Sequence, residues 1–322
     1  MTVADITACS SRRFPTWEAF QMRVFVTGAS GHIGSAVIPE LLGAGHQVVG
    51  LARSDESAGK LAAAGAEVRR GDLGDLDVIQ KGAADADGMI HLAYRRDLSI
   101  SGDMAAVVGE HMKVISAVGE ALEGSGKPFA APGGTLMLWA GGIAGRPGTE
   151  EDTVESGMLA DPENAMVALA ERGVRSAVIR LAPVVHSPLD RQGFTPALIG
   201  IAREKGVAAY VGDGANRWPA VHTLDAARLF RLALESARAG SRLHGVAEEG
   251  VPFREFAEAI GRNLGLPAVS IAPDDAAGHF GFLGMFAAAD NPSSSTLTRR
   301  WLGWQPTRPG LIADLDEGHY FA

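Results

Sequence analysis

Cysteine is almost absent from this sequence, since Cys9 is the only one among 322 residues. A single thiol cannot form a disulfide within the chain, and it excludes a metal site built from several cysteines. Such sparse cysteine usage is typical of a reducing compartment, which predicts a cytoplasmic protein.

Basic clusters and long apolar runs are also lacking. The chain has 29 basic and 38 acidic residues, a net charge of −9, and no block of Lys or Arg, which argues against nucleic acid or an anionic membrane as a partner. No apolar run approaches the roughly 20 residues of a membrane span. The nine histidines show no H-E-x-x-H or similar ligand spacing, so no metal is predicted. The expected partner is a small-molecule substrate, bound by a monomer or a homodimer.

Residues 1–21 are mixed and polar, without the apolar core of a signal peptide. A buried-strand pattern starts directly after Met22. Two interpretations stay open: a leader or misplaced start ahead of Met22, or an ordered arm packed through Phe14, Trp17 and Phe20.

Three glycines follow the first apolar stretch in the pattern G-x-x-G-x-x-G: Gly28, Gly31 and Gly34. A β-branched run precedes the motif and a helix-like segment follows it, which is the context of a dinucleotide-binding turn. Glycine permits the tight turn, lets backbone N–H groups reach a pyrophosphate, and lets helix and strand pack closely. The motif therefore predicts dinucleotide binding.

The end of the second expected strand discriminates between the two nicotinamide cofactors. An acidic residue about 20 positions after the glycines would bind a free ribose 2′-hydroxyl, whereas a basic residue would accept a 2′-phosphate. Arg53 and Ser54 stand at this place, and both suit a phosphate dianion. Asp55 and Glu56 follow, where they are expected to open a helix. The sequence favours NADP over NAD.

Apolar segments alternate with helical ones along the chain, which predicts an α/β fold with a doubly wound parallel sheet (Rossmann) and a smaller C-terminal substrate lobe. The expected Rossmann domain covers residues 22–185 with 221–247 returning to it, and the lobe covers 186–220 and 248–322. A helix is expected over residues 102–123. The expected strands are residues 23–28, 46–53, 66–73, 87–94, 134–141 and 174–185.

Ligands on such sheets lie beyond the carboxyl ends of the strands. The expected strands therefore bring one set of residues to a common crevice. These are Asp72, Leu73, Leu92, Ala93, Tyr94, Ala140, Gly141, Pro183, Val184 and Val185.

From Met22 to the C-terminus the chain resembles the extended and atypical short-chain dehydrogenase/reductase group, in its sugar epimerase/dehydratase-like branch. The motifs that carry the resemblance are "VTGASGHIG", "GDL", "IHLA", "IRLAPVVHSP" and "PAVHTLDAARLF".

The resemblance implies a role in cofactor binding for several positions, with core packing as the alternative for the apolar ones. By this resemblance Gly28, Ser30, Gly31, His32 and Ile33 line the pyrophosphate, Asp72 and Leu73 the adenine, Ala93 the ribose, and Pro183, Val184 and Val185 the nicotinamide carboxamide.

One feature of that group is missing. Its members usually carry Y-x-x-x-K on the helix after the fifth strand, where lysine lowers the tyrosine pKa for proton exchange with the substrate. Residues 149–174 contain neither Tyr nor Lys, and none of Tyr94, Tyr210 and Tyr320 has a lysine four positions later. The usual Ser or Thr is also missing from the expected end of the fifth strand, residues 138–145.

Two residues are candidates to replace this relay. Tyr94 directly follows the fourth expected strand, and His186 follows the sixth with an imidazole that titrates near neutrality. Each has a structural alternative, since Tyr94 can pack over the cofactor and His186 can satisfy a loop carbonyl. Water, or a substrate that is easily protonated such as an imine, is a further possibility.

The substrate side is expected in residues 209–222. Arg217 is suited to clamp a carboxylate or phosphate, Trp218 to form an apolar wall, and Asn216 lies beside them. The alternative is a tight turn with Trp218 anchoring the lobe. Together these features predict an NADP-dependent oxidoreductase acting on a carbonyl, alcohol or imine with an atypical active site. An NADP-bound protein with a non-redox or regulatory function is the alternative.

Overall fold

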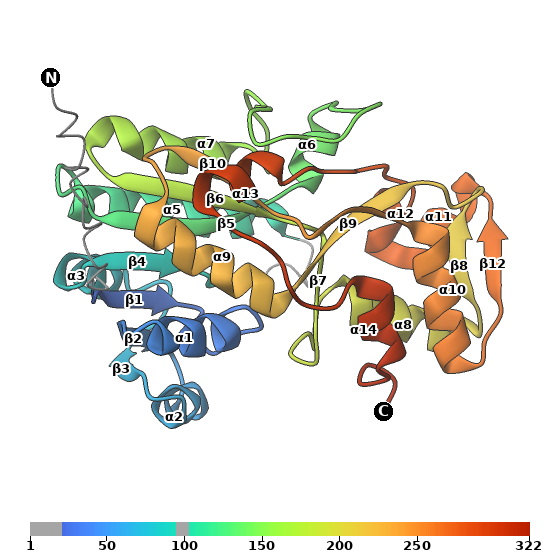
Figure 1. Cartoon of the computed structure of the whole chain (residues 1–322), viewed down its shortest axis with the longest axis horizontal. Coiled ribbons are helices and arrows are strands. Elements are labelled where there is room, and N and C mark those ends of the chain that lie inside the picture. Colours follow the sequence, from blue (N-terminus) through green and yellow to red (C-terminus); the bar gives the residue numbers. More distant parts are fainter. Residues whose placement is uncertain (1–20, 95–102) are drawn as a thin grey trace, which may run out of the picture.

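The computed structural model of the chain describes residues 21–94 and 103–322. The two interpretations of residues 1–21 therefore concern a segment that, apart from Gln21, lies outside the described residues. The described chain forms a layered sheet domain and a smaller lobe beside it (Figure 1).

Seven parallel strands form the main sheet in the order β10-β6-β5-β4-β1-β2-β3. Strand β1 lies inside the sheet, and its run of Val and Phe is buried because helices cover both faces. The predicted doubly wound α/β fold is confirmed. The strands are β1 (Arg23–Thr27), β2 (Gln47–Ala52), β3 (Glu67–Arg70), β4 (Gly88–His91), β5 (Pro128–Gly134), β6 (Arg175–Leu181) and β10 (Ser241–Gly245).

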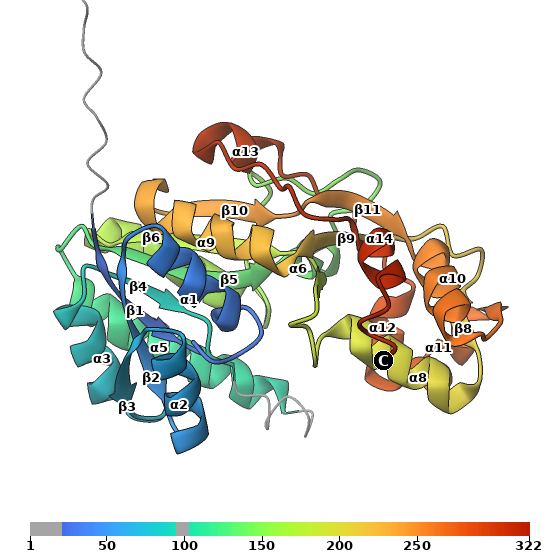
Figure 2. The ribbon, with the colours of Figure 1, turned by 60° about the horizontal axis from the view of Figure 1, so that its bottom comes forward.

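Helices cover the two faces of this sheet (Figure 2). One layer holds α1 (Gly34–Gly43), α2 (Asp55–Ala63) and α9 (Thr223–Ser236), which share a core with the sheet. The other layer holds α3 (Leu76–Asp85), α5 (Met104–Leu122) and α7 (Asp161–Ala168), followed by the short 3-10 helix η1 (Leu169–Arg172). No helix in the described ranges is long and apolar enough to cross a membrane.

The fifth strand differs from its predicted position. Residues 134–141 were expected as the strand, but β5 ends at Gly134, and the apolar run that follows forms helix α6 (Leu136–Ala140). The run "LMLWA" is compatible with either a buried strand or a buried helix. The true strand "PFAAPGG" has weak strand formers but pairs over its length with β6, so the tertiary context overrides propensity. Ala140 and Gly141 are consequently not at a strand end.

The smaller lobe is built mainly from the chain after β6. Its core gathers Phe side chains around Trp218. Two small sheets, β11-β9-β7 and β12-β8, support it. The strands are β7 (Val184–His186), β8 (Ala208–Val211), β9 (Arg217–His222), β11 (Glu248–Pro252) and β12 (Ala268–Ile271). The helices are α8 (Phe194–Lys205), α10 (Phe253–Leu264), α11 (Ala276–Phe280), α12 (Gly284–Ala287) and α14 (Leu311–Asp316), with 3-10 helices η2 (Pro273–Asp275) and η3 (Gly281–Leu283).

The chain crosses between the two parts more than once. After β9, helix α9 and strand β10 return to the main sheet. Helix α13 (Thr296–Leu302) later contacts α9 and β10, and Trp304 is buried in the core of the sheet domain. A segment that the sequence assigns to the lobe, residues 296–304, thus packs on the sheet domain.

A buried charge network fixes α7 to the sheet. Glu163 of α7 accepts hydrogen bonds from Arg180 Nε at 2.8 Å and Nη2 at 2.6 Å, and from Arg242 Nε at 2.7 Å. Burial raises the pKa of Glu163, but the two arginines outweigh it and hold the pKa below its ordinary value of 4.5. Arg180 has no exposed surface, and it also donates to the carbonyl oxygens of Thr149 and Asp152. The network therefore holds the segment after α6 as well.

Glu163→Ala should lower the free energy of unfolding by about 3–5 kcal/mol, because it leaves the Arg180 guanidinium buried without its partner. Denaturant unfolding measures this, and Glu171→Ala, at an exposed site in η1, should change stability by less than about 0.5 kcal/mol. Since the folded pKa of Glu163 is depressed, its contribution is complete above pH 4.5 and is lost as pH falls through the folded pKa. Equal stability of the two variants at neutral pH would contradict this role.

Candidate active site

The glycine-rich loop lies directly on the carboxyl end of β4. Gly28 has φ +67°, and a Cβ there would lie 2.5 Å from both the nitrogen of Ala93 and the carbonyl carbon of Leu92. At Gly34 a Cβ would lie 2.2 Å from the carbonyl oxygen of Gly28. These two positions admit only glycine, for the reasons that the motif predicts.

Helix α1 begins at Gly34, directly after His32 and Ile33 of this loop. Its N-cap is Ile33, no side chain of the described residues caps it, and its first turn holds no acidic residue. The turn itself is closed by a hydrogen bond from Gly31 N to Gly28 O of 3.0 Å. An uncapped helix N-terminus beside backbone N–H groups is an anion-binding arrangement, so the loop fits a pyrophosphate.

His32 ties the loop to the segment that connects the two parts of the molecule. Its Nε2 lies 2.8 Å from Thr223 Oγ1, and that hydroxyl donates to the carbonyl oxygen of His186 at 3.1 Å. Burial lowers the pKa of His32, Asp190 opposes this, and His186 adds to it. The His32 ring thus anchors the loop. The His32 backbone stays within the loop that is predicted to bind the pyrophosphate.

The expected adenosine end of the site lies where β2 and β3 stop. Arg53 is exposed, and Ser54 is the N-cap of α2, with its hydroxyl accepting from Ser57 N at 3.2 Å. Arg70, which the sequence analysis did not single out, donates to the Ser54 carbonyl at 2.7 Å. The carboxylate of Asp72 accepts a hydrogen bond from Gly74 N at 3.2 Å, within the turn that carries Leu73.

The end of β5 is half-exposed and carries no long side chain. It consists of Pro132, Gly133 and Gly134, and a Cβ at Gly134 would meet nothing within 4 Å. Thr135 follows directly, so the structure corrects the expectation that no Ser or Thr stands at this strand end. Its hydroxyl is fully buried, however, and accepts from Asn291 Nδ2 at 3.0 Å.

Ala140, predicted to bind cofactor, lies instead at the end of helix α6, because β5 stops six residues earlier. Pro183 and Val185 are half-buried where the chain leaves β6 and enters β7, at the expected crevice edge. Val184 between them is buried in the lobe core. Val184 is therefore a core residue, and of these three residues only Pro183 and Val185 are exposed enough to contact a ligand.

The two candidate proton donors are placed very differently. Tyr94 follows β4 and is 57% exposed; it directly precedes residues 95–102, which lie outside the described residues. His186 has no exposed surface, and its Nδ1 lies 2.9 Å from Asp314 Oδ2 of helix α14. This burial argues against contact between His186 and a substrate, and it assigns the ring to docking the C-terminal helix.

The predicted substrate residues are occupied by contacts within the lobe. Asn216 Nδ2 donates to the carbonyl oxygens of Ala287 and Ala289, and Arg217 forms a two-pronged ion pair with Asp290 at 2.8 and 3.0 Å. Trp218 has no exposed surface and packs on Phe rings. The structure thus corrects the substrate-wall role of Trp218: the ring is the core of the lobe.

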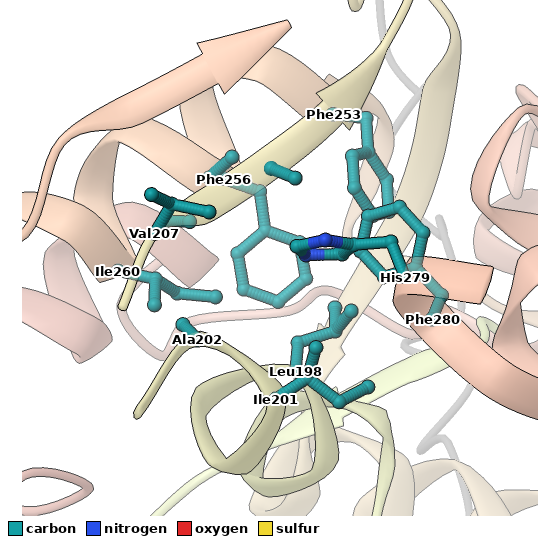
Figure 3. Close-up of a pocket in the computed structure, with 12 residues that line it drawn as sticks. Leu198, Ile201, Ala202, Val207, Phe253, Phe256, Ile260, His279 and Phe280 are labelled. Carbon is teal, nitrogen blue, oxygen red and sulfur yellow. The ribbon is translucent and has the colours of Figure 1, made fainter. Parts of the chain in front are cut away.

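An apolar pocket lies elsewhere in the lobe, between α8, β8, α10 and α11 (Figure 3). It is small and partly open to solvent, and His279 is the one titratable residue among those that line it. The other lining side chains, such as Leu198, Phe253, Phe256 and Ile260, belong to or adjoin the lobe core. None of the predicted site residues lines this pocket.

Sequence reasoning missed Arg70, Thr135 and Asp314. Arg70 lies in a strand that was predicted, and pairing that strand with its neighbour would have brought Arg70 beside Ala52. Thr135 was missed because the fifth strand was placed too late. Asp314 belongs to no motif, so no signal in the sequence joins it to His186.

Gly28→Ala should abolish measurable dinucleotide binding, because the new methyl group overlaps the backbone of β4 and the residue would have to adopt φ +67°. Titration of intrinsic fluorescence with NADPH measures this. Gly43→Ala, at the other end of α1 where a Cβ meets nothing within 4 Å, is the matched control and should bind normally. Normal binding by Gly28→Ala would show that the loop does not hold the cofactor.

Comparison with known proteins agrees with this geometry. Residues 24–116 match the model of the NAD dependent epimerase/dehydratase family. An uncharacterized protein of Schizosaccharomyces pombe is 46% identical over 302 residues, which cover 93% of this chain and all of that protein. A 2-alkyl-3-oxoalkanoate reductase of Stenotrophomonas maltophilia is 29% identical over 266 residues, 78% of each chain.

The fold itself matches solved structures. A dTDP-glucose 4,6-dehydratase from Streptomyces venezuelae, crystallised with NAD and TYD bound, superimposes with a TM-score of 0.73 and 21% identity, over 92% of this chain and 96% of the dehydratase. The strand order, the glycine-rich loop on β4 and these similarities lead to one conclusion: the chain belongs to the NAD-dependent epimerase/dehydratase family of extended short-chain dehydrogenases/reductases.

Proposed function

We propose that this protein is an NADP-dependent oxidoreductase that interconverts a small-molecule carbonyl or imine with its alcohol or amine. The observation that carries the proposal is the open end of β5, Pro132 to Gly134. Only β4 separates β5 from β1, the strand that leads into the uncapped N-terminus of α1. A Cβ at Gly134 would meet nothing within 4 Å, which supports a place for a flat ring and a substrate beside the phosphate-binding loop. The similarity to a 2-alkyl-3-oxoalkanoate reductase supports a reductase.

The choice of NADP rests on the adenosine end of the site. Arg53 is exposed at the end of β2, and among the described residues it forms no ion pair. A guanidinium available to an incoming anion suits a 2′-phosphate. Asp55 and Glu56 do not occupy the strand end, since both lie in the first turn of α2.

The residues of the chain have distinct tasks in this proposal. When bound, NADPH supplies a hydride to the substrate carbon. The loop from Gly28 to Gly34 holds the pyrophosphate through backbone N–H groups. The end of β5 leaves space for the reacting carbon, and the oxygen or nitrogen that gains electron density there takes a proton from Tyr94 or from water.

Helix α7 contributes no proton donor in this scheme. Members of this group usually carry Tyr and Lys on a helix after the fifth strand; α7 carries neither, and its Glu163 accepts hydrogen bonds from Arg180 and Arg242. A substrate that needs little acid assistance, such as an imine or an activated carbonyl, fits such a site better than an unactivated ketone. The absence of the tyrosine–lysine pair thus favours imines and activated carbonyls as the substrate class.

The absence of a tyrosine–lysine pair also favours a second candidate function. A protein that binds NADP and performs a non-redox or regulatory task would also have no need of a tyrosine–lysine pair. The two functions differ in whether NADPH is consumed.

Incubation of the protein with NADPH and a panel of β-keto esters, enones, simple ketones and imines tests the proposal. The expected result is loss of the reduced-nicotinamide absorbance with at least one activated carbonyl or imine, and slower or no loss with simple ketones. Tight NADPH binding without consumption across the panel would favour the non-redox alternative.

Tyr94→Phe should slow turnover on an active substrate by about 10²–10⁴-fold, if the phenol is the proton donor, and should leave cofactor affinity nearly unchanged because the ring is kept. Steady-state kinetics and a parallel NADPH titration measure the two effects. Unaltered turnover would remove the phenol from the mechanism and leave water as donor, whereas loss of NADPH binding would assign Tyr94 to the cofactor wall.

A further inference from the structure

The side chain of Arg70 reaches the place where a 2′-phosphate is expected. Strands β2 and β3 pair in parallel with Ala52 opposite Arg70, so the arginine stands beside the residue that precedes Arg53. Its Nη1 donates to the Ser54 carbonyl at 2.7 Å, and its Nη2 donates to Asp55 Oδ1 at 2.6 Å. Arg53, which directly follows β2, and Arg70, the last residue of β3, thus both adjoin Ser54 in the β2–α2 turn.

The partners of Arg70 differ in strength. The Ser54 carbonyl belongs to a capped helix start and holds the guanidinium in place. The Asp55 side chain is fully exposed and that of Arg70 is 51% exposed, so their ion pair contributes little to stability. A guanidinium has five N–H donors, and the two contacts described leave others for a further acceptor.

The neighbouring arginine shows that this placement is specific. Arg69 directly precedes Arg70 in β3, but its side chain contacts other partners, because successive side chains of a strand lie on opposite faces. It donates to Asp85 at 2.7 Å, and its guanidinium carbon lies 5.8 Å from the centre of the Phe25 ring. Arg69 is thus built into the structure, whereas Arg70 is held at the surface beside Ser54.

We propose that Arg70 is a second residue that reads the 2′-phosphate of NADP, together with Arg53, and that Asp55 is the partner it exchanges for the phosphate. This inference rests on the proposed function, which assigns NADP to the site. A phosphate dianion carries more charge than one carboxylate and accepts bidentate hydrogen bonds from a guanidinium. It therefore competes well with an exposed aspartate.

Dissociation constants of NADPH and NADH, measured by calorimetry with the full chain, test the inference. Arg70→Ala should weaken NADPH binding about ten- to a hundredfold, the range expected for hydrogen bonds to a charged group, and should leave NADH binding nearly unchanged. Arg69→Ala removes the same charge from the same strand and should not alter the ratio of the two constants. Asp55→Asn should strengthen NADPH binding, because the competing carboxylate is gone.

Arg53→Ala separates the inference from the proposed function. If the wild-type protein does not prefer NADPH, the assignment of NADP fails, and the inference fails with it. If the wild type prefers NADPH and Arg53→Ala loses the preference while Arg70→Ala keeps it, only the role of Arg70 is overturned. An equal loss of both cofactors in Arg70→Ala, or weaker NADPH binding by Asp55→Asn, would likewise contradict it.

Discussion

The backbone of Gly28 lies against the backbone of Leu92 and Ala93 with no side chain between them, and the site depends on this contact. It brings the loop that leads into α1 onto the end of β4, where a helix N-terminus without a side-chain cap suits an anion. His32 then joins the same loop to Thr223, where the chain returns from the lobe to the sheet. Displacement of the loop would therefore disturb both the anion site and the junction of the two parts.

The side of the sheet formed by β5, β6 and β10 is organised around a buried charge network rather than around a proton relay. A Cβ at Gly133 would lie 3.5 Å from Glu163 Oε2, so the buried network borders the open end of β5. Its arginines hold the pKa of Glu163 low and keep the carboxylate ionised at neutral pH. Such a group is a poor proton donor. In the proposed function, α7 shapes the crevice while the proton comes from elsewhere.

The parts of the fold that follow local rules were predictable from the sequence. The glycine motif needs a strand before it and a helix after it, and both are present. The fifth strand was not predictable, because the pairing of β5 with β6 outweighs its Pro and Gly content. His186 looked like a site residue because it follows the sixth expected strand, and Trp218 because an indole ring suits an apolar substrate wall. Their burial depends on α10, α11 and α14, which lie far along the chain and leave no mark on the local pattern.

The central claim is that this site transfers hydride from NADPH without the tyrosine–lysine pair. Reaction of an active substrate with NADPH deuterated at the nicotinamide C4 position tests it most directly. The account predicts that deuterium appears on the former carbonyl or imine carbon of the product while NADP⁺ forms in equal amount. Conversion of the substrate with no label transferred, and with the NADPH left reduced, would contradict it.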